Sequence, residues 1–299
     1  MRTDIEFPSR GETCRGWLYL PDGRAPGDRH AAIVMAHGFS AVKEMYLDKF
    51  AERFCRDGFA VMVFDFRFLG ASSGEPRGQV NPYDQHEDFR NAISWVSQRP
   101  EADPERIGIW GSSFSGGHAL FLAAFDRRIK AAVAQVPAIS GWRGAVMAGM
   151  KPMLQQMLDE RAKERTARYG SAEPVYRPVV APPGEPAALA TPDSYEWFLK
   201  GAGRAPSWIN RVLVDSTDAA STYDPGGSIE LISPTPLMIV AAEHDSLIPI
   251  AQVRDAFERA GEPKALHVFD CGHFDIYDTE PWFTRAVELE AEWFRKHLG

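Results

Sequence analysis

Long apolar runs, paired cysteines and an excess of basic residues are all missing from this 299-residue chain. No apolar stretch approaches the roughly 20 residues that a membrane-spanning helix needs. The three cysteines, Cys14, Cys55 and Cys271, are too few and too widely spaced for a disulfide framework or a metal-ligand motif. The net charge of −8 argues against nucleic-acid binding and against an anionic-membrane patch.

Signals for export and for nucleotide binding are also missing. The first seven residues alternate polar and apolar side chains as a strand does, unlike a secretory signal. No phosphate-binding loop and no dinucleotide-binding glycine motif occurs, so we expect no metal, nucleotide or flavin cofactor. The unpaired cysteines fit a reducing compartment, and we expect a cytoplasmic protein whose partner is a small molecule, neither a nucleic acid nor a membrane.

The most informative segment that is present is the pentapeptide Gly111–Ser115, with the sequence GSSFS. It follows the apolar run 107–110 and precedes the helix-like stretch 116–122. A serine at a sharp strand-to-helix turn, flanked by small residues, is how many hydrolases present a nucleophile. The motif departs from the usual G-x-S-x-G at Ser115, and taken alone it is also compatible with an ordinary connection between a strand and a helix.

Two later segments supply partners for Ser113 in a meaningful order. The predicted strand 235–242 is followed closely by Asp245, and the predicted strand 264–269 by His273. Nucleophile, acid and histidine occur in this order, each after a strand, in one large class of hydrolases. We therefore predict that Ser113, Asp245 and His273 form a catalytic triad.

Several other polar residues have competing interpretations. Glu243 is an alternative acid of the triad. His37 precedes the serine in the chain and is expected to shape a loop, whereas His118 is expected to be a satisfied interior histidine and His86 to lie on a solvated helix face. Asp65 is expected to anchor the glycine-flanked loop that follows it.

An oxyanion hole is expected beside Ser113. The apolar strand 31–36 ends in His37, Gly38 and Phe39, where the loop can offer the backbone N–H of Phe39. The residue after the nucleophile, Phe114, offers a second N–H. Two such donors stabilise the negative charge that develops on the carbonyl oxygen during acyl transfer.

These features together resemble the α/β-hydrolase superfamily. The resemblance is carried by His37-Gly38-Phe39, the run 63–72, the turn at Ser113, Asp245 and Gly272-His273. More narrowly, Lys43–Tyr46 and Ser113–His118 resemble a branch of dienelactone-hydrolase-like esterases that also holds thiohydrolases and acyltransferases of polyketide pathways.

Strands alternating with helices predict an α/β fold with a parallel sheet covered on both faces. The resemblance implies an α/β-hydrolase fold with a mostly parallel eight-stranded sheet and an inserted, mainly helical cap. We assign residues 1–140 and 226–299 to the hydrolase core and residues 141–225 to the cap.

Within the predicted cap, residues 142–167 are expected to form a helix with four methionines and a leucine at helical spacing. Ordinary packing against the core is the favoured interpretation of this face, and an adaptable acyl pocket is the alternative. Under the alternative, the pocket is lined by Met150, Met153, Met157, Trp197 and Trp208. Tyr46, which follows the loop after strand 31–36, is a separate candidate for substrate binding.

The expected activity is hydrolysis of carboxylic esters or thioesters through an acyl-Ser113 intermediate, with His273 as the base and Asp245 orienting it. An acyltransferase would use the same triad and pass the acyl group to an alcohol or an amine. An amidase or peptidase, and a non-catalytic ligand-binding protein of the same fold, are further alternatives. A homodimer is expected only by analogy with the fold.

Overall fold

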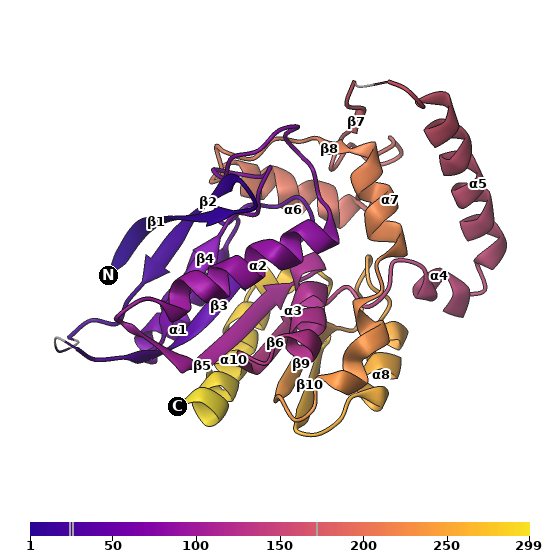
Figure 1. Cartoon of the computed structure of the whole chain (residues 1–299). Helices are drawn as coiled ribbons and strands as arrows, with labels where there is room; N and C mark the ends of the chain where they lie inside the picture. Colours follow the sequence, from indigo (N-terminus) through magenta and orange to yellow (C-terminus); the bar gives the residue numbers. More distant parts are fainter. Residues whose placement is uncertain (24, 26, 172) are drawn as a thin grey trace.

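A central eight-stranded sheet organises the computed structural model, which describes residues 1–23, 25, 27–171 and 173–299 (Figure 1). The strand order is β1-β2-β4-β3-β5-β6-β9-β10. Strand β2 pairs antiparallel with β1 and β4, and every other neighbouring pair is parallel. The mostly parallel eight-stranded sheet expected from the sequence is therefore confirmed.

The strands of this sheet are β1 (Arg2–Ser9), β2 (Glu12–Tyr19), β3 (His30–Ala36), β4 (Ala60–Phe64), β5 (Ala102–Ser112), β6 (Ile129–Gln135), β9 (Leu237–Ala242) and β10 (Lys264–Phe269). The elements around it are α1 (Leu47–Arg56), α2 (Pro82–Ser97), α3 (Phe114–Phe125), η1 (Pro225–Leu231), α8 (Ile250–Arg259), α9 (Asp275–Asp278) and α10 (Trp282–Leu298).

Helices cover both faces of the sheet. Helices α1 and α10 contact each other and the central strands, while α2 packs on α3 and α8 packs on η1, which contacts α3 (Figure 1). The central strand β4 is buried along its whole length, as expected for a continuous apolar run enclosed on both faces. Helix α2 begins where the side chain of Asn81 accepts the backbone N–H of Tyr83 at 2.9 Å, followed by Pro82 at the first helical position.

Most of the long segment between β6 and β9 lies outside the central sheet and its covering helices (Figure 1). It contains α4 (Arg143–Met147), α5 (Lys151–Ala167), β7 (Tyr176–Arg177), α6 (Pro192–Ala202), β8 (Val212–Leu213) and α7 (Val214–Thr222). The single helix expected over residues 142–167 is interrupted between α4 and α5, where Gly149 has a φ of +71° that a continuous helix cannot contain.

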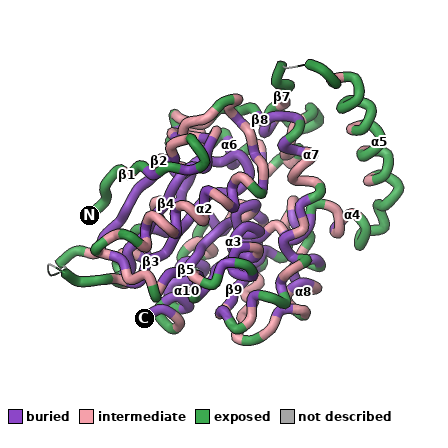
Figure 2. Tube along the Cα trace, viewed as in Figure 1, coloured by how far each residue is buried: buried purple, intermediate pink, exposed green. Residues whose placement is uncertain are grey.

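Helix α5 stands away from the core and is exposed along much of its length (Figure 2). The side chains of Met147, Met150 and Met153 are 48%, 43% and 59% exposed. The favoured interpretation of these methionines as core packing is therefore wrong. The methionines do recur at helical spacing, but the helix face on which they lie is exposed to solvent over most of α5. None of the helices in the described part of the chain combines the length and apolar character that crossing a bilayer demands.

A carboxyl group, that of Glu290, lies fully buried between α10 and the sheet. Its Oε2 accepts the indole N–H of Trp110 at 3.0 Å, and burial raises the pKa of Glu290 from 4.5 to about 8. The desolvation penalty on the charged form outweighs the stabilisation that one hydrogen bond supplies. The folded protein therefore holds a proton on Glu290 at neutral pH.

We predict that this proton makes stability depend on pH. Because the pKa is higher in the folded state, the contribution of Glu290 is complete below about pH 4.5 and is lost as pH rises through about 8. The full loss is on the order of 5 kcal/mol at 1.36 kcal/mol per pKa unit. Urea unfolding at pH 5 and pH 8 should show this fall in the wild type and a flatter profile in Glu290→Gln, whose amide oxygen can still accept from Trp110. Parallel profiles in the two proteins would contradict the assignment.

Candidate active site

Ser113 occupies the sharp turn between β5 and α3. Its φ and ψ are 57° and −118°, a backbone conformation that L side chains rarely adopt. A Cβ on Gly111 would lie 2.0 Å from the carbonyl oxygen of Ser115, and one on Gly116 would lie 2.8 Å from the Cα of Pro137. The turn therefore excludes side chains at both glycines, and Ser113 stands where the strand ends.

The departure from the usual motif has a structural use. The Ser115 hydroxyl donates to the carbonyl oxygen of Ala36 at 2.7 Å and accepts the backbone N–H of Ser112 at 2.9 Å. Both hydrogen bonds are buried. They tie the turn at Ser113 to the end of β3, directly before the loop expected to form the oxyanion hole.

We predict that Ser115→Ala destabilises the fold by about 1–3 kcal/mol, because it leaves a buried N–H and a buried C=O without this partner. Chemical denaturation measures the change. Ser97→Ala is a suitable control, since that partly buried hydroxyl lies on α2 and donates to the carbonyl of Ile93 at 2.7 Å, away from the turn at Ser113. An unchanged midpoint for Ser115→Ala would contradict this prediction.

His273 lies between Ser113 and Asp245. Its Nε2 is 3.1 Å from the Oγ of Ser113, and its Nδ1 is 2.7 Å from Oδ2 of Asp245. The second carboxylate oxygen of Asp245 accepts the backbone N–H groups of Leu247 and Ile248 at 2.8 and 2.7 Å. The imidazole is fully buried, and a carboxylate held by two backbone donors orients it beside the serine hydroxyl.

The competing acid and histidines have other partners. Glu243 forms an exposed ion pair with Arg254 at 2.7 Å. His118 is buried and its Nε2 lies 2.8 Å from Oε1 of Gln85, which confirms it as a satisfied interior histidine. His86, expected on a solvated face, is instead 1% exposed, with its Nε2 2.8 Å from the hydroxyl of Tyr223.

The loop after β3 passes very close to the serine. A Cβ on Gly38 would lie 2.9 Å from the Cβ of Ser113, so only glycine fits there. The Nδ1 of His37 is 3.0 Å from the carbonyl oxygen of Gly38, and burial lowers the pKa of His37, which keeps its ring neutral. The rings of Phe39 and Phe114 meet edge to face at 5.5 Å, so the two residues expected to form the oxyanion hole lie side by side.

Asp65 holds the loop after β3 in place through hydrogen bonds and an ion pair. Its carboxylate accepts the backbone N–H groups of Lys43 at 2.8 Å and Ala71 at 2.9 Å, which confirms the predicted anchoring of the following loop. Its Oδ2 also lies 2.7 Å from the ammonium of Lys43. Burial alone would lower the pKa of Lys43, but the carboxylates of Asp65 and Glu44 together outweigh burial and leave that pKa raised. The buried ion pair of Lys43 with Asp65 joins the loop after β3 to the loop after β4.

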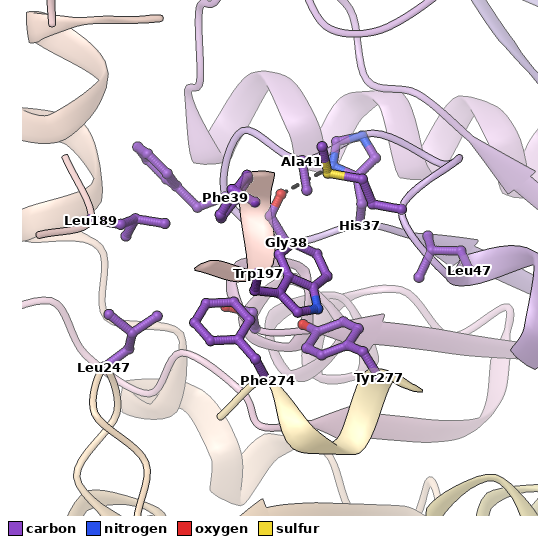
Figure 3. Close-up of a pocket in the computed structure, with 13 residues that line it drawn as sticks. His37, Gly38, Phe39, Ala41, Leu47, Leu189, Trp197, Leu247, Phe274 and Tyr277 are labelled. Carbon is purple, nitrogen blue, oxygen red and sulfur yellow. Dashed lines mark hydrogen bonds between the residues drawn. The ribbon is translucent and has the colours of Figure 1, made fainter. Parts of the chain in front are cut away.

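Ser113 lines a narrow, mainly apolar pocket. Figure 3 shows the pocket with Phe39, Leu189 and Leu247 around it. The rings of Trp197, Phe274 and Tyr277 cluster at its wall, with ring centroids of Trp197 5.0 Å from those of the other two. The Tyr277 hydroxyl accepts from Ser112 Oγ at 2.6 Å, and burial raises the pKa of Tyr277. The pocket therefore suits a small apolar group. Burial keeps the phenol of Tyr277 neutral.

Ser113 also lines a second and larger cavity, of about 370 Å³. Phe39, Leu189 and Leu247 line both hollows, so Ser113 lies at their junction. Residues from the predicted cap, among them Met157, Arg161 and Tyr223, form the outer wall of the larger cavity. The arrangement can hold a substrate with two arms of different size that meet at the serine.

The six residues predicted to bind substrate lie in different places. Trp197 lines the narrow pocket, and Tyr46 packs behind it with ring centroids 5.5 Å apart. Trp208 donates its indole N–H to the carbonyl of Ser40 at 3.0 Å and lines a separate small hollow. Met157 lines the larger cavity. Met150, which directly precedes α5, and Met153 on α5 are exposed and are not among the described residues that line either hollow at Ser113.

Sequence reasoning missed several residues that line the two hollows. Phe274 and Tyr277 follow His273 by one and four positions, and this proximity was a usable signal. Tyr223 and Arg161 carried no comparable signal, because they come from separate helical or loop segments that only the folded cap brings to Ser113.

Comparisons with known proteins agree with this architecture. A profile of the X-Pro dipeptidyl-peptidase (S15) family matches residues 17–275. The quorum-quenching protein AidA of Acinetobacter baumannii is 31% identical over 294 residues, covering 98% of this chain and 94% of AidA. The thiohydrolase aneE of Aspergillus aculeatus is 32% identical over 279 residues, covering 90% and 85%.

A solved structure extends the similarity to three dimensions. The polyketide transferase grgF of a Penicillium species is 32% identical over 303 residues, covering 100% of this chain and 97% of grgF. The crystal structure described as the α/β hydrolase GrgF from Penicillium superposes with a TM-score of 0.83 at 29% identity, covering 100% of this chain and 99% of that one.

Proposed function

Because the chain belongs to the α/β-hydrolase superfamily, with a match to the S15 family, we propose that it cleaves carboxylic esters or thioesters through an acyl-Ser113 intermediate. The observation that supports this most strongly is the chain of contacts from Ser113 Oγ through His273 to Asp245, at 3.1 and 2.7 Å. The thiohydrolase among the relatives agrees with a thioester or ester substrate.

In the proposed reaction, the hydroxyl of Ser113 attacks the substrate carbonyl carbon while Nε2 of His273 accepts its proton. The Asp245 carboxylate holds the imidazole in the tautomer that can accept, and stabilises the imidazolium that forms. The backbone N–H groups of Phe39 and Phe114 donate to the oxyanion. His273 then protonates the leaving group, and water, deprotonated by the same histidine, releases the acid.

Acyl transfer is a second candidate, favoured by the similarity to a polyketide transferase and by the apolar walls of the two hollows at Ser113. The acyl-Ser113 intermediate would be the same. An alcohol or amine bound in place of water would lose its proton to His273 and take the acyl group.

The first test is the rate of p-nitrophenol release from p-nitrophenyl esters of two to twelve carbons, with thioesters of the same acids in parallel. The proposal expects turnover and a transient acyl adduct visible by intact-protein mass spectrometry. Added alcohols or amines that divert the acyl group from water would favour transfer. Turnover of Xaa-Pro anilides but of no ester or thioester would overturn the proposal in favour of a peptidase.

A further inference from the structure

One side chain in the larger cavity differs in kind from the others. Near Ser113 the cavity is lined by apolar groups, including Phe114, Leu247 and Ile248. Arg161, from α5, is the one charged residue among the described residues that line it. The Arg161 side chain lines the cavity and is 18% exposed, so it is largely shielded from bulk solvent.

The charge of Arg161 is only partly neutralised. Its Nε lies 3.3 Å from a carboxylate oxygen of Asp218, and the guanidinium of Arg165 lies 3.8 Å from the other oxygen of the same carboxylate. Two cations thus share one anion, and the three side chains carry a net charge of +1. Since Arg165 is 69% exposed and lies outside the cavity lining, the part of the excess charge that a bound molecule meets is on Arg161.

The guanidinium is also held in place. Arg161 Nη1 donates to the hydroxyl of Ser221, which in turn donates to the carbonyl of Asp218 at 2.7 Å. A fixed, planar guanidinium with free N–H donors matches the two oxygens of a carboxylate and loses little entropy on binding it.

We propose that the larger cavity binds a substrate arm that is apolar next to the scissile carbonyl and ends in a carboxylate, which Arg161 receives. This inference rests on the proposed function, and it names the substrate class for the same serine. One net positive charge suits a monoanion, and the apolar walls between Ser113 and Arg161 suit the methylene chain that joins the two ends. The carboxylate can belong to the acyl arm or to the leaving group, and the test separates these sources.

The kinetic test uses pairs of substrates that differ only in charge. For the acyl arm, mono-p-nitrophenyl suberate is compared with methyl p-nitrophenyl suberate, together with shorter and longer homologues. For the leaving group, octanoyl thioesters of 3-mercaptopropionate and of its methyl ester are compared by thiol release. We expect kcat/KM to favour the charged member of one pair, and Arg161→Gln to reduce that preference by about tenfold to a hundredfold.

Lys163→Gln is the matched control, because it removes a cation from the same helix, outside both the cavity lining and the cluster of Arg161, Asp218 and Arg165. It should leave the preference unchanged, and Arg161→Lys should keep part of it. A preference that is absent, or that survives in Arg161→Gln, overturns the inference while the hydrolase proposal stands.

Binding gives an answer that does not depend on turnover. In a Ser113→Ala background, calorimetry should show tighter binding of monomethyl suberate than of dimethyl suberate, and Arg161→Gln should abolish the difference. If no ester or thioester is hydrolysed, the hydrolase proposal fails, and this measurement still decides the site: a difference that depends on Arg161 supports it, and equal affinities overturn it.

Discussion

Replacing Ser113 with alanine is expected to lower kcat/KM for ester hydrolysis by roughly five to six orders of magnitude. The hydroxyl is the atom that would form the acyl bond, and His273 at 3.1 Å from it has no other nucleophile to deprotonate in that position. The backbone donors of Phe39 and Phe114 would persist in the variant, so a small rate above the uncatalysed reaction should survive. p-Nitrophenol release, followed over hours, measures both effects.

The neighbouring residue provides the control. Ser112 is buried, and its hydroxyl donates to Tyr277 and accepts from Gln135 at 2.9 Å, instead of facing His273. Ser112→Ala should therefore cost less than about tenfold in kcat/KM. Circular dichroism verifies that both variants fold. Activity that survives in Ser113→Ala but is lost in Ser112→Ala would show that Ser113 is not the nucleophile.

The core could be read from the sequence because its signals are local. The interior strands β3, β4 and β9 are short apolar runs, and β5 ends in one; Ser113, Asp245 and His273 follow the ends of β5, β9 and β10. Parallel strands place their carboxyl ends at one edge of the sheet. Recognition of three strand ends was therefore sufficient to predict that these side chains lie close together, and the structure brings them within hydrogen-bonding distance of one another.

The surroundings of the cap residues, and of the core residues that contact the cap, could not be predicted in the same way. They depend on partners that lie far away in the chain. His86 continues the buried stripe of Phe89 and Ile93 on α2, but its hydroxyl partner is Tyr223, 137 residues later. Without knowledge of the contact with Tyr223, a histidine at position 86 is predicted to be exposed to solvent. Likewise, the spacing of the α5 methionines defines a face of the helix but not which way that face points.

Asp245→Asn is expected to reduce kcat by about a thousandfold to ten-thousandfold, although it barely changes the shape of the site. One carboxylate oxygen accepts the N–H groups of Leu247 and Ile248, and the other faces Nδ1 of His273. The asparagine oxygen must take the position beside the two backbone donors, because an NH₂ group there would face only donors. Its NH₂ then points at Nδ1.

That orientation forces Nδ1 to accept a hydrogen bond, and so moves the imidazole proton to Nε2, where it blocks the transfer from Ser113. The loss should therefore appear in kcat, with KM little changed, and with an unfolding midpoint close to that of the wild type. Glu243→Gln is the decisive comparison, since Glu243 pairs with Arg254 at the surface and its loss should alter kcat less than twofold. A larger cost for Glu243→Gln than for Asp245→Asn would make Glu243 the acid of the triad.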